Sequence, residues 1–378
     1  MVQPPEQCKP SAMRRKATHS RHRQAVVPVG EGGYAACDFR NEPRPTSMTA
    51  TPFDDFRSLL AALPPADHAA GARVRALFAK AEKPKESLGR IEDIAAWISA
   101  WSGRAPPAIN RPLVAIFAGN HGAVRHGISP RPVAATANEV ELCAAGGAAI
   151  NQVCIANDLG LKVFDLALDI PAGDITEEAA LDERGCAATM AFGMEAVAGG
   201  ADLLCLGDLG VGNSTIAAAL CAALFGGEGT DWVGPGSGAD AAMMARKAEV
   251  VDRALALHGQ GLGDPLEVLR RVGGREFAAI CGAILAARME KIPVLLDGFV
   301  ATAAAAVLYA ANPGALDHCL LASLSPEPGH AKAAERLGLR PLLDFGISHG
   351  EGVGAALAAG IVKAAALTSS GMAMAVRL

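Results

Sequence analysis

The sequence predicts an α/β protein with a doubly wound, mainly parallel (Rossmann-like) sheet. Short apolar segments alternate along the chain with longer helical ones. The short segments are apolar throughout, which is typical of strands buried on both faces of a sheet. Polar or glycine-rich residues follow most of them, and open α/β sheets bind ligands at the carboxyl ends of their strands. We therefore expect one shared cleft at that edge of the sheet.

Five strands are expected, with helices between them. The predicted strands are 112–118, 161–166, 203–206, 293–296 and 320–323, and the predicted helical segments are 133–156, 176–200, 214–225, 239–258, 275–290 and 300–311. Ahead of the first strand, apolar residues recur at helical spacing over 53–82, with a break at Pro64-Pro65. A further helix runs through Trp101, and Ser87 can cap its start. The first part of the fold is thus predicted to be a small helical unit.

The composition excludes several classes of protein. The chain is 51% apolar with 42 glycines, which suits helices packed closely against a parallel sheet. A net charge of −5 gives no reason to expect nucleic acid as a partner. No strongly apolar run approaches the roughly 18 residues of a membrane-spanning helix, so we expect no membrane partner. The nine cysteines lack CxxC or Cys/His ligand spacing, which favours a reducing, cytoplasmic location without structural zinc.

Residues 1–47 differ from the rest of the chain. They hold eight Lys/Arg against four Asp/Glu, several prolines, and no apolar signal-peptide core. An Arg-rich transit peptide is an alternative, although the prolines disfavour an amphipathic helix. We expect a disordered extension or a mis-assigned start, with Met48 as the true first residue, and leave this segment out of the fold.

The stretch 203–220 combines an apolar strand, a glycine loop and a helix start. The glycines of this first glycine loop, Gly207, Gly210 and Gly212, let the backbone turn sharply and approach a ligand. Asn213-Ser214-Thr215 favours the start of a helix, where free N–H groups and the helix dipole attract anions. The loop has neither GxGxxG spacing nor GK[ST], so a nucleotide phosphate monoester fits better than a dinucleotide or ATP. The alternative is a tight strand-to-helix connection without a ligand.

A second glycine loop, residues 350–354, precedes the last predicted helix. Its glycines, Gly350, Gly352 and Gly354, surround a single carboxylate, Glu351. From the residue alone, Glu351 fits a cap for the helix that starts near Val353, where the helix dipole favours a negative charge.

Together these segments resemble the nicotinate-nucleotide:dimethylbenzimidazole phosphoribosyltransferase family of cobalamin lower-ligand assembly. The matching stretches run in order over nearly all of residues 80–365 and are Lys83–Glu92, Phe117–Pro130, Gly146–Asn151, Gly207–Leu220, Val233–Gly238, Pro293–Ala305, Ser323–His330 and Gly350–Ala358. The resemblance implies a large α/β nucleotide-binding domain (105–344) and a small helical domain formed by 48–104 with 345–378. It also implies a homodimer with no metal or redox cofactor.

The implied reaction transfers phosphoribose from nicotinate mononucleotide to a benzimidazole nitrogen, with inversion at the anomeric carbon. The products would be α-ribazole 5′-phosphate and nicotinate. The leaving pyridinium loses its positive charge as it departs and needs no general acid, whereas the attacking base must lose a proton to a carboxylate. By position, the resemblance implies that Glu351 is this general base. We expect its apolar, glycine-walled surroundings to raise its pKa toward the working pH.

The resemblance also implies contacts with the nucleotide and with the acceptor base. The implied nucleotide- and phosphate-binding residues are Gly207, Asp208, Gly210, Gly212, Asn213, Ser214, Gly234, Gly236, Lys247, Ser325, Gly350 and Gly352. The implied base-binding residues are Asn120, His121, Ser129 and Asn138. From the residues alone, Lys247 is also typical of a solvated helix lysine, and Asp208 of a turn-forming aspartate. Asp297 either orients ribose hydroxyls or caps the helix after Val300, and His121 and His330 fit hydrogen-bonding loop residues better than proton shuttles.

Several positions depart from the family pattern. Where the family has an acidic residue and a glutamate, this chain has Asn120 and Asp208. Where the family has an arginine and a histidine, it has Pro235 and Leu324. The family triplet Met-Arg-Leu is Ile347-Ser348-His349 here. The two missing arginines are bidentate donors that Pro and Ser cannot imitate. An alternative function is therefore a nucleotide- or base-binding protein that kept the fold without catalysis. A dinucleotide-dependent oxidoreductase fits the coarse α/β pattern, but its glycine fingerprint and ribose-binding acid are missing from the sequence.

Overall fold

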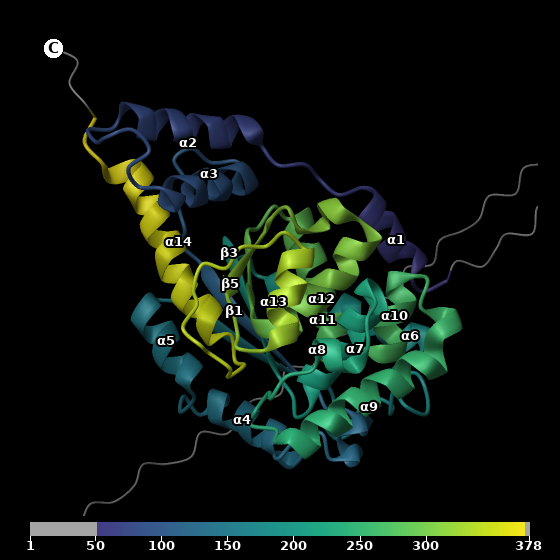
Figure 1. Cartoon of the computed structure of the whole chain (residues 1–378). Helices are drawn as coiled ribbons and strands as arrows, with labels where there is room; N and C mark the ends of the chain where they lie inside the picture. Colours follow the sequence, from purple (N-terminus) through teal and green to yellow (C-terminus); the bar gives the residue numbers. More distant parts are fainter. Residues whose placement is uncertain (1–50, 375–378) are drawn as a thin grey trace, which may run out of the picture. The chain divides into compact units, whose positions relative to one another are not determined.

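The computed structural model describes residues 51–374 and is organised around a five-stranded sheet with helices on both faces (Figure 1). The strands are β1 (Pro112–Ala118), β2 (Gly160–Asp165), β3 (Leu203–Leu209), β4 (Val294–Asp297) and β5 (Cys319–Ser323). They pair in parallel in the order β2-β1-β3-β4-β5, which reverses direction between β1 and β3. This is a doubly wound α/β sheet, so the predicted fold class is confirmed.

Helices connect the strands and cover both faces of the sheet. The α-helices of the described residues are α1 (Asp54–Ala61), α2 (His68–Lys80), α3 (Arg90–Ser102), α4 (Ala134–Ala144), α5 (Ala149–Asn157), α6 (Glu183–Met194), α7 (Asn213–Phe225), α8 (Gly229–Trp232), α9 (Ala241–His258), α10 (Pro265–Val272), α11 (Arg275–Met289), α12 (Gly298–Ala311), α13 (Pro328–Arg336) and α14 (Val353–Gly371). The predictions for residues 1–47 lie outside the described residues.

The strand predictions agree with the structure to within one residue at each end, except that β3 runs on to Leu209. Two helix predictions were too long. The segment 133–156 is divided into α4 and α5 at Gly146, whose φ of +80° lies in the left-handed region and ends a helix. In the segment 176–200, α6 begins only after Asp182, whose side chain accepts a hydrogen bond from the Gly185 N–H. The predicted Ser87 cap was also wrong, because the N-cap of α3 is Gly89.

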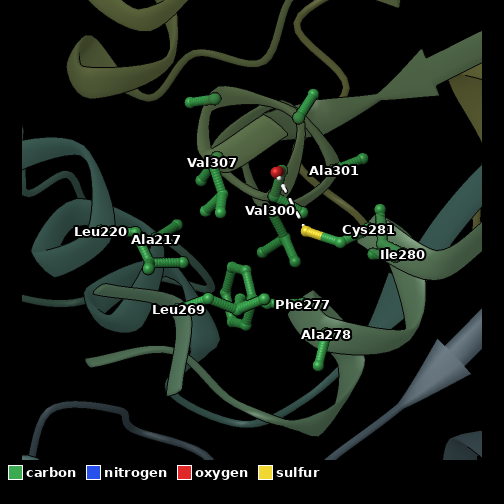
Figure 2. Packing of buried hydrophobic residues seen from close by; sticks show 14 of the residues in the cluster. Ala217, Leu220, Leu269, Phe277, Ala278, Ile280, Cys281, Val300, Ala301 and Val307 are labelled. Carbon is green, nitrogen blue, oxygen red and sulfur yellow. Dashed lines mark hydrogen bonds between the residues drawn. The ribbon is translucent and has the colours of Figure 1, made fainter. Parts of the chain in front are cut away.

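Alternate strand residues pack into two separate cores, one on each face of the sheet. On β1, Ala115 and Phe117 join one core, whereas Val114 and Ile116 join the other. Figure 2 shows part of the first core, where Phe277 of α11 lies among side chains of α7, α10 and α12. Burial on both faces explains why the strands are apolar throughout.

Helix α14 packs in the second core, against β3, β4 and β5 and against α3 and α5. Within residues 51–374 it is the one helix long and apolar enough to cross a membrane, and half of it is buried in the fold. No such segment was expected from the sequence, because α14 is rich in alanine and has few strongly apolar residues in a row. Its packing against the sheet is that of a core helix.

The first three helices do not lie together. Helices α2 and α3 pack against each other and against α14. Helix α1 lies apart from them in Figure 1, and its residues contact the α6 and α10 region. There the Phe53 N–H donates to Glu183 Oε1 over 3.3 Å, and Arg57 lies 2.6 Å from Asp264. All described residues belong to one compact unit, and the division into 105–344 and 48–104 with 345–378 stays a prediction.

Candidate active site

A cleft of about 110 Å³ opens at the carboxyl ends of β3, β4 and β5, where the strand pattern predicts it. The lining segments are 128–131, 208–210, 212–214, 235–237, 297–300 and 347–350, together with Glu139, Lys247, Ser325 and Glu327.

The first glycine loop joins β3 to α7 and borders the cleft. Gly212 is the N-cap of α7 and has a φ of +82°, a conformation that favours glycine. Asp208 at the end of β3 accepts a hydrogen bond of 2.8 Å from Asn213 Nδ2. Because Gly212, Asn213 and Ser214 all line the cleft, the amino end of α7 is available to an anion there.

The two glycine loops are in backbone contact. The Glu351 N–H donates to the Asp208 carbonyl over 3.0 Å. A Cβ atom on Gly207 would lie 2.4 Å from the Gly352 nitrogen, and one on Gly350 would lie 2.5 Å from the Asp208 carbonyl oxygen. Glycine is therefore required at Gly207 and Gly350 for the two loops to approach this closely. Glu351 has a φ of +65°, which is uncommon for a residue with a side chain, so the contacts between the two loops hold it in this conformation.

The Glu351 carboxylate lies behind the wall of the cleft, and the residue is 1% exposed. Its Oε2 accepts a hydrogen bond of 3.3 Å from the Ile150 N–H, at the amino end of α5. Its Oε1 lies 2.9 Å from Nε2 of His349, and His349 lines the cleft. Glu351 thus interacts with the start of α5 and is not the N-cap of α14, which is Gly352.

The pKa of Glu351 is lowered, so the predicted rise was wrong. Burial raises this pKa, but the hydrogen bond and charge of His349 and the Ile150 N–H outweigh it. The predicted rise rested on burial alone and did not include His349. The hydrogen bond and charge of Glu351 raise the pKa of His349 in turn. A carboxylate with a lowered pKa is ionised at neutral pH, which a proton acceptor requires.

Lys247 on α9 holds two loops of the cleft together and is 1% exposed. Its Nζ donates to Ser214 Oγ over 3.1 Å and also to the Gly234 carbonyl. The same loop is held by Glu327, whose Oε1 accepts a hydrogen bond of 2.6 Å from the Gly236 N–H. Burial lowers the pKa of Lys247, and the charge of Glu327 acts against this. An ammonium has three N–H donors, and these two contacts leave one for a ligand.

Ser325 follows β5 and is positioned by His330. The Ser325 N–H donates to His330 Nδ1 over 3.0 Å, so Nδ1 is an acceptor and the ring proton is on Nε2. Nε2 lies 3.0 Å from the Thr302 hydroxyl, which in turn donates to the Gly298 carbonyl over 2.8 Å. Burial lowers the pKa of His330 to about 4, so the ring is neutral at physiological pH. It acts here as a hydrogen-bonding residue, as the sequence predicts.

Two buried carboxyl groups, Asp208 and Asp297, line the cleft. Burial raises the pKa of Asp208 to about 7, with further contributions from the charges of Glu276 and Asp297. Burial also raises the pKa of Asp297 to about 7, partly offset by hydrogen bonds from backbone N–H groups. Asp297 Oδ2 accepts one of these from Gly354 over 2.8 Å. The side chain therefore caps α14, and it makes no cap hydrogen bond to its own helix α12.

The structure brings nine of the twelve predicted nucleotide-binding residues to the cleft wall. They are Asp208, Gly210, Gly212, Asn213, Ser214, Gly236, Lys247, Ser325 and Gly350. Gly207 and Gly352 contact each other where the two glycine loops meet, and Gly234 lies against Glu327.

Of the four predicted base-binding residues, only Ser129 lines the cleft. Asn120 is buried and donates from Nδ2 to the Leu168 carbonyl over 3.1 Å. His121 is also buried, with Nε2 2.5 Å from Glu276 Oε1. Asn138 is exposed on α4. The structure places these three residues away from the cleft wall.

Four charged or titratable side chains of the cleft wall were not predicted from the sequence: Arg131, Glu139, Glu327 and His349. Arg131 and Glu139 form an ion pair of 2.6 Å. Glu327 follows β5, so the rule that sites lie after strands could have identified it. No local pattern marks Arg131 or Glu139. Within residues 51–374, no group of three His, Cys, Asp or Glu side chains is placed to hold a metal ion.

Comparison with known proteins identifies the chain. Residues 63–376 match a family model described as "Phosphoribosyltransferase", so the protein is a phosphoribosyltransferase. It is 65% identical to the nicotinate-nucleotide–dimethylbenzimidazole phosphoribosyltransferase of Rhizobium etli, over 86% of this chain and 96% of that protein. A protein of the same name from Brucella anthropi is 65% identical, also over 86% of this chain and 96% of that protein. The chain belongs to the nicotinate-nucleotide–dimethylbenzimidazole phosphoribosyltransferase family, as its motifs predict.

Solved structures agree with this assignment. CobT from Thermus thermophilus matches with a TM-score of 0.77 and 37% identity, covering 81% of this chain and 97% of that one. A second structure, of a nicotinate-nucleotide–dimethylbenzimidazole phosphoribosyltransferase from the same organism, matches with a TM-score of 0.76 and 36% identity, covering 82% of this chain and 97% of that one.

Proposed function

We propose that this protein transfers phosphoribose from nicotinate mononucleotide to dimethylbenzimidazole or a related base in cobalamin nucleotide-loop assembly. The products are α-ribazole 5′-phosphate and nicotinate. One observation carries the proposal: the backbone of the Glu351 loop contacts Gly207 and Asp208 at the carboxyl end of β3, where the first glycine loop begins. The loop that borders the cleft and the carboxylate behind the cleft wall are thereby held together. Membership of the family supports the same reaction.

The nucleotide phosphate binds at the amino end of α7. Ser214 and Ser325 offer hydroxyl groups, and Lys247 offers a buried ammonium donor. Charge-assisted hydrogen bonds of this kind are stronger than neutral ones. Since Pro235 stands where the family has an arginine, Lys247 supplies the positive charge in this part of the cleft.

The chemistry needs one proton acceptor and two aligned reactants. The acceptor nitrogen attacks the anomeric carbon, the bond to nicotinate breaks, and its electron pair stays on the nicotinate nitrogen. The other ring nitrogen of the acceptor then loses its proton to the Glu351 carboxylate. In their ionised forms, which are populated above about pH 7, Asp208 and Asp297 stabilise the positive charge that develops on the ribose. Holding both reactants in one cleft removes much of the entropic cost of bringing them together.

The acceptor base lies between Ser129 and the segment 347–349, which border the same cleft. Asn120, His121 and Asn138 are not included in this proposal, because their side chains are bound elsewhere or exposed.

The direct test is to incubate the purified protein with nicotinate mononucleotide and dimethylbenzimidazole and to measure free nicotinate. In Glu351→Gln we expect kcat to fall by about 100-fold or more, because the proton acceptor is lost. The dissociation constant of the nucleotide should change little, since a residue acting in the chemical step contributes little to ground-state binding. Glu335→Gln, on the exposed face of α13, is the matched control and should retain activity.

Two outcomes would contradict the proposal. If both ligands bind but no nicotinate is released, the protein is a catalytically degenerate nucleotide- or base-binding protein of the same fold. If Glu351→Gln loses nucleotide affinity as strongly as kcat, the role of Glu351 is structural.

The proposal includes a cytoplasmic homodimer. The seven cysteines of the described residues are all free and buried, which supports a reducing compartment. Large apolar side chains are exposed on α4 and α5, with Leu142 at 47% and Ile155 at 77%. The homodimer is the state that the family resemblance implies, and these side chains lie on a surface open to a second copy.

A further inference from the structure

His349 is the side chain that links the buried Glu351 carboxylate to the cleft. Its Nε2 lies 2.9 Å from Glu351 Oε1. The His349 side chain is 50% exposed, whereas that of Glu351 is 2% exposed. The other polar contact of the carboxylate is the Ile150 N–H, a donor that cannot accept a proton.

A buried base must lose its proton before each new turnover. If Glu351 takes a proton from the acceptor base, it becomes a neutral acid with no contact to solvent. Restoring the carboxylate therefore requires a neighbour that can accept a proton and release it to water. An imidazole can do both, because its unperturbed pKa is about 6.5, and the Glu351 charge that raises the pKa of His349 is absent once Glu351 is protonated.

We propose that His349 is a proton-relay and positioning residue, which holds the Glu351 carboxylate and carries the acceptor's proton from it to solvent. This inference rests on the proposed function. The proton released when the new C–N bond forms passes from the acceptor nitrogen to Glu351. Before this transfer His349 releases its own Nε2 proton to water and is the neutral Nδ1–H tautomer, so that Nε2 can accept the proton from Glu351. The imidazolium that forms again loses its Nε2 proton to water, and Glu351 becomes a carboxylate.

The other charged groups near His349 do not provide this route. Arg131 and Glu139 are paired with each other at 2.6 Å, and their charges act on His349 in opposite directions. Asp208 lies on the β3 side and is itself buried. The Cys143 thiol is near Glu351, but burial raises its pKa to about 11, so it does not exchange protons at neutral pH.

The test compares His349→Gln and His349→Ala. Glutamine retains an N–H donor toward Glu351 but cannot titrate. We expect His349→Gln to keep KM for both substrates and to lose kcat by about tenfold or more, because proton transfer is impaired and binding is not. In His349→Ala, added imidazole should restore kcat in a concentration-dependent way, since the position is open to solvent. The pH dependence due to His349 should disappear in both variants.

His126 provides a matched control. It forms a similar pair with a carboxylate, Nε2 to Asp174 Oδ2 at 2.8 Å, but does not line the cleft. His126→Gln should keep the parental pH profile and show no response to imidazole.

Three results would overturn the relay. Parental kcat and pH profile in His349→Gln would show that no proton passes through residue 349. A loss of activity in His349→Ala that imidazole does not restore would mean that His349 only holds Glu351 in place. An NMR titration in which the His349 pKa is the same in the parent and in Glu351→Gln would show that the pair does not form. This last measurement needs no turnover, so a failed relay is distinguishable from a parent protein that releases no nicotinate.

Discussion

Lys247 is a buried ammonium without a salt-bridge partner among residues 51–374. Its Nζ donates to a hydroxyl and a carbonyl, and the charge of Glu327 acts on it without direct contact. Burying a charge without a partner is costly. A ligand phosphate would supply the missing negative charge, which is why we assign this residue to nucleotide binding.

In Lys247→Met we expect KM for nicotinate mononucleotide to rise by roughly 10- to 100-fold. A hydrogen bond to a charged group contributes about 1.5–3 kcal/mol, and each 1.4 kcal/mol corresponds to about a tenfold change. The kcat at saturating nucleotide should change much less. Steady-state kinetics measures both, with Lys80→Met at the exposed end of α2 as control. An unchanged KM would mean that Lys247 only joins the loops at Ser214 and Gly234.

The residues that the sequence could identify belong to continuous motifs. Glu351 and the glycines around it stand next to one another in the chain, so their spacing carries information. His349, Arg131 and Glu139 acquire their neighbours only through folding. The error in the Glu351 pKa has the same origin, because the decisive partner, His349, was noted only as a departure from the family pattern. The misplaced Asn138 shows that position in a motif does not determine which face of a helix meets the cleft.

At the level of elements, the strands were predictable because each is a short, continuous apolar segment. The helices were predicted less accurately, since alanine and glycine give weak signals about where a helix stops. Gly146 ends α4 through its left-handed conformation, and this depends on the local turn rather than on composition. The position of α1 against the α6 and α10 region depends on long-range contacts that no local pattern reveals.

Helix α14 offers a paired test of the packing that positions Glu351. A Cβ atom on Gly354 would lie 2.3 Å from Asp297 Oδ1 and 2.4 Å from Ser323 Cβ. Gly354→Ala should therefore lower the free energy of unfolding by about 1–3 kcal/mol, because the core must shift to accommodate the methyl group. Gly371 ends the same helix and has nothing within 4 Å of such a Cβ atom.

Gly371→Ala should be neutral or stabilising by up to about 1 kcal/mol, because alanine favours the helix. Urea unfolding of the two variants measures both changes. Equal effects at the two positions would show that the contact between α14 and β4–β5 is looser than the structure indicates.

For the whole molecule, the buried carboxyl groups predict how stability depends on pH. The pKa of Asp297 in the folded protein is about 7, above the value of about 3.9 for an unfolded aspartate. Between these two values the folded state binds more protons than the unfolded state. The contribution of this group to the free energy of unfolding therefore falls as pH rises through this window.

Asp297→Asn removes that dependence while retaining an oxygen that can accept the Gly354 hydrogen bond. At about pH 5 the variant and the parent should have similar free energies of unfolding, and at about pH 8 the variant should be the more stable. Denaturant titrations of the parent and the variant at the two pH values measure this difference in the free energy of unfolding. The contributions of most other titratable groups cancel, because both proteins contain them. A difference that does not change with pH would mean that Asp297 is solvated in the folded protein.

The close approach of Gly207 and Gly352 fixes the position of Glu351 independently of the residues that we propose contact the acceptor base. No side chain fits between these backbones, so the segment that carries Glu351 is anchored regardless of what precedes it. Ile347 and Ser348 come just before that anchor and border the cleft. We expect substitutions there to change the choice of aromatic acceptor while the acid keeps its place, so these two positions are the starting point for a library of altered lower ligands.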